Sequence, residues 1–193
     1  VDPYSYIEAN VMGHLVMLEA ARSLPRLQHF LYASSSSVYG GNTHLPYRED
    51  DRVDHPISLY AATKRSDELI SEAYGHIFGL PQTGLRFFTV YGPWGRPDMA
   101  PWLFADAILS GRPITLYEGG RLKRDFTFVE DIISGIIGAL DCSPTDGKPR
   151  LLNVLSLWHN SFDDLIGSKA DKVVETVTEH LGEAGLKGMI PDD

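Results

Sequence analysis

The chain has 193 residues, of which 43% are hydrophobic, so it holds enough apolar side chains for one substantial core. Its 17 Lys and Arg residues against 26 Asp and Glu residues give a formal net charge of −9, which argues against nucleic acid or an anionic membrane as the main partner. No apolar run approaches the length of a membrane span, and the single cysteine, Cys142, cannot form an internal disulfide. These features favour a cytoplasmic protein and leave a small-molecule ligand open.

The first half of the chain predicts a helix, a strand, a loop and a second helix. Apolar residues recur at helical spacing across residues 4–23, and QHFLYASSS (28–36) is typical of a short buried parallel strand that ends in serines. Residues 37–59 are rich in Gly, Pro and charge and predict a long loop. Residues 59–78 predict an amphipathic helix with an apolar stripe, and glycine and proline follow as stop signals.

The second half continues this alternation. QTGLRFFTVYG (82–92) predicts one strand, and PWLFADAILSG (101–111) predicts a helix that ends at a glycine. PITLYEGG (113–120) predicts a short strand, and FVEDIISGIIGAL (128–140) predicts another helix. Strands that alternate with helices imply an α/β fold with a largely parallel sheet.

Tyr60 and Lys64 lie four positions apart at the start of the helix predicted for residues 59–78. This spacing puts both side chains on one helix face, where the ammonium favours the phenolate form of the tyrosine and so a general base. The spacing alone is a weak signal, because a surface Tyr and Lys can share it without a common task. The serines at 34–37 strengthen it, since they end a predicted parallel strand, and loops at such strand ends converge on the ligand crevice.

Together, SSSS (34–37), VYG (38–40) and YAATK (60–64) resemble the extended short-chain dehydrogenase/reductase family, which includes sugar-nucleotide epimerases and dehydratases with a bound nicotinamide cofactor. GLRFFTVYGPWGRPDMA (84–100) and RDFTFVEDI (124–132) are similar to the signature of UDP-glucuronate 4-epimerases. The resemblance implies a partial Rossmann-like parallel sheet flanked by helices, with part of a smaller substrate-binding domain.

The same resemblance implies that the N-terminal dinucleotide-binding half is missing, because the sequence contains no G-x-x-G-x-x-G phosphate loop. We therefore expect residues 1–92 to be the C-terminal half of a dinucleotide-binding domain. Residues 93–193 are expected to form a mixed substrate-binding region with segments that return to the sheet, and residues 155–193 match the family only loosely.

Carried over by position, the family's catalytic triad falls on Ser35, Tyr60 and Lys64. Tyr60 would be the base, Ser35 would hydrogen-bond the sugar 4-hydroxyl, and Lys64 would hold the cofactor ribose and tune Tyr60. Asn10, on the first helix, matches an asparagine that supports the active site, and Phe87 would lie near the nicotinamide. Tyr60, Lys64, Phe87 and Asn10 are thus the expected cofactor-binding residues, and the cofactor is NAD.

The expected substrate-binding residues are Ser36, Ser37, Thr89, Arg96 and Arg124. Thr89 and Arg96 would bind the sugar carboxylate, for which a guanidinium is the matching fork, and Arg124 would face the diphosphate. Ser36 and Ser37 stand where 4,6-dehydratases of the family carry an Asp-Glu pair, so dehydration is disfavoured. No metal is expected, because the seven histidines show no paired ligand spacing.

The resemblance predicts C4 epimerisation of a UDP-hexuronate, UDP-glucuronate, through a 4-keto sugar. A UDP-glucuronate decarboxylase or another nucleotide-sugar epimerase or dehydratase stays open. A different class also stays open, namely a non-catalytic truncated remnant or interaction module, and the isolated chain is expected to be inactive. By analogy with the family, a homodimer would form through the Tyr60 helix and the N-terminal helix.

Overall fold

The computed structural model describes residues 2–114, 125–146 and 148–155. The chain divides into two compact units. The larger comprises Val1–Phe88 and Ile132–Leu155, and the smaller includes Thr89–Asp131. We describe each unit by itself.

The larger unit contains a parallel sheet of three strands in the order β1 (Phe30–Ser35), β2 (Gln82–Phe87) and β5 (Arg150–Val154). Ser35 lies opposite Phe87, and Phe87 lies opposite Val154, so the three strands end at one edge of the sheet. This arrangement confirms the predicted α/β class with a parallel sheet. β5 was not predicted as a strand.

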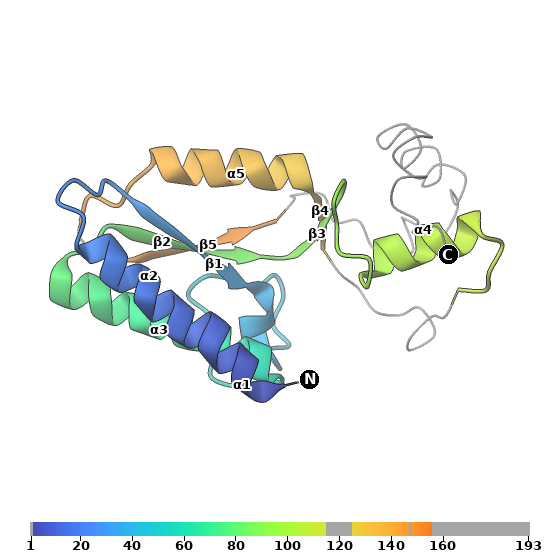
Figure 1. The fold of residues 1–193 in the computed structure, drawn as a ribbon, viewed down its shortest axis with the longest axis horizontal. Coiled ribbons are helices and arrows are strands. Elements are labelled where there is room, and N and C mark those ends of the chain that lie inside the picture. Colours follow the sequence, from blue (N-terminus) through green and yellow to red (C-terminus); the bar gives the residue numbers. More distant parts are fainter. Residues whose placement is uncertain (1, 115–124, 147, 156–193) are drawn as a thin grey trace. The chain divides into compact units, whose positions relative to one another are not determined.

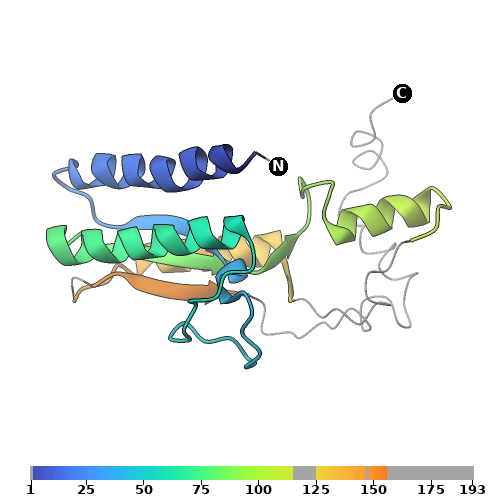
Figure 2. The same cartoon turned by 90° about the horizontal axis from the view of Figure 1, so that it is seen from below.

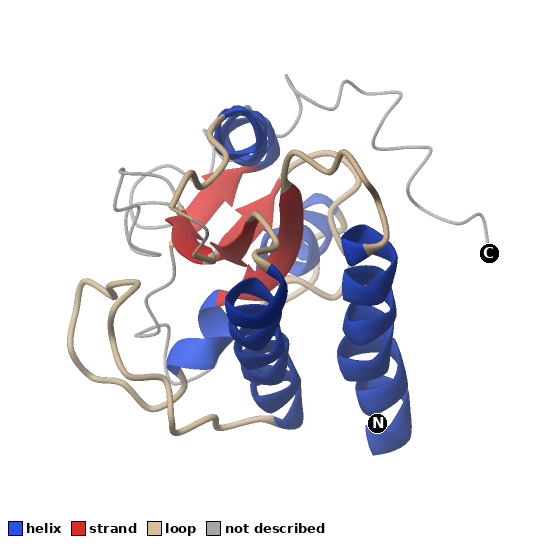
Figure 3. Ribbon diagram, turned by 90° about the vertical axis from the view of Figure 1, so that its left-hand side faces the viewer, coloured by secondary structure: helices blue, strands red, loops and turns tan. Residues whose placement is uncertain are grey.

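Helices cover both faces of this sheet (Figures 1 and 3). On one face, α1 (Pro3–Tyr6), the π-helical segment η1 (Ile7–Met12) and α2 (Gly13–Arg22) run on without a break, as predicted apart from the π turn. On the same face lies α3 (Leu59–Phe78), side by side with α2 (Figure 2). The helix α5 (Val129–Asp141) lies on the other face (Figure 3).

Local signals explain the bounds of α3. The Ser58 side chain accepts a hydrogen bond from the backbone N–H of Ala61 at 3.1 Å and so caps the first turn. Gly79 ends the helix in the left-handed conformation, with φ of 63°, which a glycine adopts without steric cost. The glycine stop was predicted from the sequence, whereas the Ser58 cap was not, and the predicted bounds are correct.

The buried face of α3 differs from a simple apolar stripe. The apolar residues Leu69 and Ile77 are 55% and 66% exposed. The residues that α3 buries are small or polar: Ala61, Thr63, Asp67, Glu68, Ser71 and Gly75. The apolar core between α2, α3 and the sheet is correspondingly small, with Leu18, Ala21 and Leu80 at its centre.

Two predicted elements differ from the structure. The single strand expected over residues 82–92 is wrong, because β2 ends at Phe87 and a separate strand, β3 (Thr89–Tyr91), follows. The Phe88 N–H bonds the carbonyl of Val154 in β5, whereas the Thr89 N–H bonds that of Asp125, so the backbone changes partner there. The loop expected over 37–59 begins with a short 3-10 helix, η2 (Ser36–Tyr39).

In the smaller unit, β3 pairs in parallel with β4 (Phe126–Phe128). The helix α4 (Ala100–Leu109) matches the helix predicted for 101–111. Of the strand predicted for 113–120, residues 113 and 114 are not in a strand and the rest lies outside the described residues.

Gly84→Ala is expected to lower the free energy of unfolding by about 1–3 kcal/mol through overpacking. A Cβ at Gly84, in the middle of β2, would lie 2.5 Å from Tyr32 Cζ and 2.7 Å from Leu151 Cδ2, on the two neighbouring strands. Urea unfolding followed by circular dichroism measures the change. Gly138→Ala in α5 is the matched control, since nothing lies within 4 Å of its Cβ, and it should not destabilise the fold. Equal midpoints for Gly84→Ala and the native chain would contradict this packing argument.

Candidate active site

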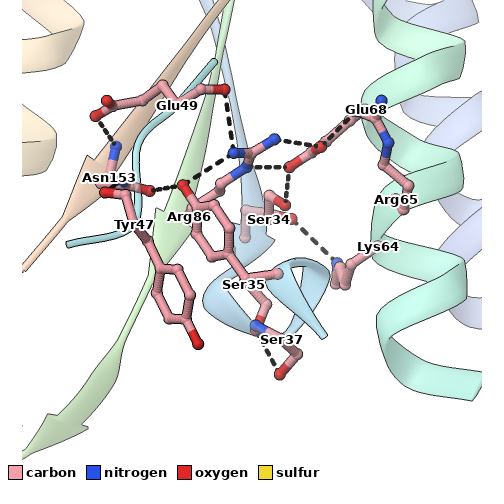
Figure 4. A network of polar contacts seen from close by, with 12 residues as sticks. Ser34, Ser35, Ser37, Tyr47, Glu49, Lys64, Arg65, Glu68, Arg86 and Asn153 are labelled. Carbon is pink, nitrogen blue, oxygen red and sulfur yellow. Dashed lines mark hydrogen bonds and ion pairs between the residues drawn. The ribbon is translucent and has the colours of Figure 1, made fainter. Parts of the chain in front are cut away.

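The serine cluster lies at the carboxyl end of β1. Ser35 is the last residue of the strand, and its Oγ accepts a hydrogen bond from the Ser37 N–H at 3.2 Å and donates to Ser37 Oγ at 3.1 Å (Figure 4). Ser35 thereby caps η2, which contains Ser36 and Ser37. The Ser35 hydroxyl is therefore held in place at the sheet edge where ligands of parallel α/β proteins bind.

Tyr60 lies in the first turn of α3, directly after the Ser58 cap. Its side chain is at the border of exposure, with the residue 36% exposed, and its ring lies 6.2 Å from that of Tyr6 between centroids. The Tyr60 carbonyl accepts a hydrogen bond from Thr63 Oγ1 at 2.9 Å. The backbone of Tyr60 is thus fixed while its phenol stays accessible to a ligand.

Lys64 follows one turn later and reaches back to β1. Its Nζ donates to the carbonyl of Ala33 at 3.1 Å and to Asp67 Oδ2 at 3.3 Å. Figure 4 shows Lys64 pointing toward the end of the strand that carries Ser34 and Ser35. The structure therefore brings the ammonium of the expected triad to the end of the strand that carries its serine.

Asn10 and Phe87, the other expected cofactor residues, lie close to this triad in the fold. Asn10, in η1, donates from Nδ2 to Thr63 Oγ1 at 2.9 Å, and Thr63 in turn bonds the Tyr60 carbonyl. Phe87 is the last residue of β2 and the register partner of Ser35. Asn10 therefore supports the first turn of α3, and Phe87 flanks the serine.

The remaining expected substrate residues lie elsewhere. Thr89 begins β3 and Arg96 follows it, both in the smaller unit, where Arg96 Nε bonds Asp98 Oδ1 at 3.0 Å. Arg124 lies outside the described residues. The roles of these three residues stay predictions.

A buried ion pair beside the triad was missed by the sequence reasoning. The side chains of Arg86, on β2, and Glu68, on α3, are each 1% exposed. Arg86 Nε lies 2.8 Å from Glu68 Oε1, and Nη2 lies 2.9 Å from Oε2, which is the bidentate geometry of a strong pair (Figure 4). Although burial alone would raise the pKa of Glu68, its hydrogen bonds with Arg86 and Ser34 hold that pKa below the usual value.

This pair belongs to a network that spans the larger unit. Ser34 Oγ donates to Glu68 Oε1 at 2.6 Å, and Arg65 Nη1 donates to Oε2 at 2.9 Å. On the other side, Arg86 Nη1 bonds the Tyr39 hydroxyl at 3.0 Å, and that hydroxyl donates to Asn153 Oδ1 at 2.7 Å. The network thus joins β1, η2, α3, β2 and β5. The arginine within the apolar strand GLRFF was the one available sequence signal for it.

A second buried polar cluster lies behind Lys64. The Asp67 side chain is 1% exposed, and burial raises its pKa to about 6 although the charge of Lys64 and the hydrogen bond with it act to lower it. His14, on α2, bonds Ser71 Oγ through Nε2 at 2.7 Å, and burial, with a contribution from Lys64, lowers its pKa to about 4. At neutral pH this cluster therefore holds a carboxylate and a neutral imidazole.

Asp67→Asn is expected to raise the free energy of unfolding at pH 8 by up to about 3 kcal/mol, from a pKa change of about two units. The folded pKa is raised, so the carboxylate costs stability above pH 6 and the cost fades as the pH falls through 6 toward 3.8. The gap between the variant and the native chain should shrink between pH 8 and pH 5 in urea unfolding. His14 is present in both proteins, so its own contribution to the pH dependence cancels in the difference between them. A gap that does not change with pH would contradict the assignment.

Other candidate sites are weak. A cavity of about 710 Å³ lies at the amino end of the sheet, away from Ser35, between residues 24–29 before β1 and the end of α5, where Leu140, Asp141 and Ser143 line it. Within the described ranges, no group of three or more His, Cys, Asp or Glu residues is arranged to hold a metal ion. In the same part of the chain, no helix combines the length and apolarity that a membrane span needs.

Known proteins share much of this sequence. The chain is 41% identical over 199 residues to a probable UDP-glucuronate 4-epimerase of Rhizobium meliloti, covering 98% of this chain and 58% of that protein. It is 52% identical over 170 residues to UDP-glucuronate 4-epimerase 3 of Arabidopsis thaliana, covering 83% and 40%. The chain spans about half the length of the curated relatives that it matches.

Solved structures show the same fold. The UDP-glucuronic acid 4-epimerase of Bacillus cereus, in complex with UDP-glucuronic acid and NAD, matches with a TM-score of 0.76 and 34% identity over 83% of this chain and 50% of that one. The UDP-glucose 4-epimerase of Thermotoga maritima, with UDP-glucose, matches with a TM-score of 0.77 and 25% identity, covering 93% and 56%. These similarities confirm the Rossmann-like fold predicted from the sequence motifs.

The family itself follows from the extent of the match. Residues 1–154 match the model of the NAD dependent epimerase/dehydratase family, which is well over half of the chain and includes every described residue but Leu155. The resemblance inferred from SSSS, VYG, YAATK and GLRFFTVYGPWGRPDMA is therefore confirmed. This chain belongs to the NAD-dependent epimerase/dehydratase family.

Proposed function

We propose that this protein is a NAD-dependent epimerase that inverts C4 of UDP-glucuronate. The observation that carries the proposal is the hydrogen bond from Lys64 Nζ to the Ala33 carbonyl, which brings the ammonium to the strand that ends in Ser35, with Tyr60 one turn away on the same helix. Relatives and structural neighbours that are named UDP-glucuronate 4-epimerases support the choice of substrate.

The residues present fit the nicotinamide and ribose end of NAD. An ammonium has three N–H donors, and Ala33 and Asp67 take two of those of Lys64, which leaves one for a ribose hydroxyl. Tyr60 is accessible and Phe87 lies next to Ser35 at the sheet edge. The sequence contains no G-x-x-G-x-x-G loop, which would bind the diphosphate of NAD. The residues named here therefore account only for the nicotinamide and its ribose.

In the proposed mechanism, Tyr60 as phenolate takes the proton of the sugar 4-hydroxyl, and Ser35 hydrogen-bonds the same oxygen. The charge of Lys64 stabilises the phenolate, and Ser35 stabilises the negative charge that develops on the sugar oxygen. When bound, NAD supplies the oxidation of C4 to a ketone and its later reduction. After the 4-keto sugar turns, Tyr60 returns the proton to the 4-oxygen, and C4 then has the opposite configuration.

Ser36, Ser37, Thr89, Arg96 and Arg124 are the proposed substrate-binding residues. Arg96 is the one with the clearest chemistry, because its guanidinium can form two parallel hydrogen bonds with the sugar carboxylate. Its bond with the exposed carboxylate of Asp98 shows that it can make such a contact, although here within its own loop.

Arg96→Ala is expected to raise the KM for UDP-glucuronate about tenfold or more, because a charge-assisted bidentate contact is lost. UDP-glucose, which has no carboxylate, should show no such change as a ligand in competition assays. The matched control is Arg48→Ala, since Arg48 forms a similar exposed pair with Asp50, with 3.2 Å between Nε and Oδ1. An equal change of KM in the two variants would mean that Arg96 does not bind the sugar carboxylate.

A homodimer through α1–α2 and α3 is also proposed. These helices expose large apolar side chains, among them Val16 and Met17 at 58% and 56%, and Leu69 and Ile77 at 55% and 66%. Large apolar side chains that are exposed in the single chain would be covered at an association site. Sedimentation equilibrium should give twice the chain mass, and a monomer at micromolar concentration would refute the dimer.

The activity test uses two proteins: the longest reading frame that contains these 193 residues, and the 193-residue chain alone. Each is incubated with UDP-glucuronate, with and without added NAD, and the products are separated by chromatography. UDP-galacturonate from the longer protein supports the proposal, and we expect the shorter chain to be inactive, since it has no phosphate loop. A UDP-pentose with loss of CO₂ would indicate the decarboxylase instead, and no product from either protein would favour a non-catalytic remnant.

A further inference from the structure

We propose that Asp67 is a positioning residue for the proposed reaction, whose buried carboxylate holds the Lys64 ammonium at the end of β1. This inference rests on the proposed function only for its kinetic consequence. The geometric part concerns two side chains of α3 and a strand carbonyl, and it can be tested without a substrate.

The contacts of Lys64 define the holding arrangement. Its Nζ has two acceptors, the Ala33 carbonyl at 3.1 Å and Asp67 Oδ2 at 3.3 Å, and its side chain is 16% exposed. The carbonyl is neutral, whereas the carboxylate adds charge and comes from the same helix, one turn away. A lysine side chain is long and flexible, so a single neutral acceptor would hold it weakly.

Among the groups that surround Asp67, Lys64 is the one that pairs with it as a cation. Glu68, the adjacent carboxylate, takes both nearby guanidinium groups, that of Arg86 from β2 and that of Arg65 from α3. His14 faces the cluster from α2 and is neutral at pH 7, because burial lowers its pKa to about 4. Tyr32 faces it from β1, where burial raises the pKa of the phenol far above neutral pH.

The Asp67 carboxylate has no hydrogen-bond partner other than Lys64 in the described part of the chain. Its Oδ1 is buried without a hydrogen-bond partner there, and its Oδ2 bonds Lys64. A carboxylate that only stabilised the fold would be expected to have more hydrogen bonds, since burying it with so few is costly. The geometry therefore points to a group kept for its effect on Lys64.

The first test measures the accessibility of Lys64 in the longer reading frame. Competitive acetylation with acetic anhydride, followed by mass spectrometry, compares the native protein with Asp67→Ala and Asp67→Asn. We expect Lys64 to be acetylated about threefold or more faster in Asp67→Ala, with Asp67→Asn in between, because the amide keeps an acceptor oxygen. Lys148, an exposed residue just before β5, is the internal reference, and its rate should not change. An unchanged rate at Lys64 would overturn the proposal.

The second test is a kinetic double-mutant cycle with Lys64→Met. Asp67→Ala should lower kcat about tenfold in the native background and have no further effect in the Lys64→Met background. Glu72→Ala, an exposed carboxylate on the same helix, is the matched control and should leave kcat unchanged. Equal losses from Asp67→Ala in both backgrounds would show a purely structural role. If the native protein converts no UDP-glucuronate, the proposed function fails, and the acetylation result still decides the positioning role.

Discussion

Tyr60→Phe is expected to lower kcat for conversion of UDP-glucuronate by about 10²–10⁴-fold, the usual contribution of a general acid–base group. The substitution removes one oxygen and keeps the ring, its packing near Tyr6 and the first turn of α3. The KM should change little, because Tyr60 is proposed to act on a proton and not to supply the main binding energy.

The measurement is the initial rate of UDP-galacturonate formation by the longer reading frame, native and variant, at saturating substrate. Tyr74→Phe is the matched control on the same helix, since the Tyr74 hydroxyl bonds Glu19 on α2, far along α3 from the Ser58 cap. It should keep nearly full activity. A Tyr60→Phe enzyme with more than a tenth of the native kcat would remove Tyr60 from the role of base.

The elements around Tyr60 could be predicted because their signals are local. The Ser58 cap, the helical spacing from Leu59 and the Gly79 stop all lie within one segment of sequence, and the observed helix has those bounds. The strand before the serine cluster has an equally local signal, since the run FLYA (30–33) gives way to serines at its carboxyl end. The family motifs lie on these same elements, so the fold class and the family could be predicted together.

The interruption at Phe88 could not be predicted locally. QTGLRFFTVYG has a continuous β pattern, and the division between β2 and β3 depends on which strands are available for pairing. Those partners, β5 and β4, come from residues 150–154 and 126–128, far along the chain. Sequence spacing carries no information on which partner each half takes.

The buried charges were missed for a related reason. Asp67 and Glu68 stand in a polar stretch of α3 that is typical of a solvated helix face, and periodicity assigns the apolar residues to the core. In the structure both carboxylates are buried instead. Arg86, on the adjacent strand, is the buried partner of Glu68, and Lys64 is the partner of Asp67. The site therefore depends on pairings between segments that the sequence shows separately.

Glu68→Ala is expected to lower the free energy of unfolding by about 3–5 kcal/mol, because it leaves the guanidinium of Arg86 buried without its counter-charge. Arg86 is 1% exposed and loses two hydrogen bonds of 2.8 and 2.9 Å, while Ser34 loses its acceptor. Urea unfolding by circular dichroism measures the change at pH 7.5. Glu19→Ala is the matched control, since Glu19 and Arg22 form an exposed pair on α2, and it should lower the free energy of unfolding far less than Glu68→Ala does.

The double variant Glu68→Ala with Arg86→Met separates the lost pair from the stranded charge. If the cost comes mainly from the unpaired guanidinium, the double variant should be more stable than Glu68→Ala by about 1–3 kcal/mol, since a long apolar side chain fills the same space. A double variant no more stable than Glu68→Ala would mean that the network stabilises the fold through its hydrogen bonds to Ser34 and Tyr39. Because Ser34 precedes Ser35 and Glu68 lies one turn after Lys64, we expect the loss of the ion pair or of these hydrogen bonds to displace the triad as well. The unfolding measurement therefore has to accompany any measurement of kcat in these variants.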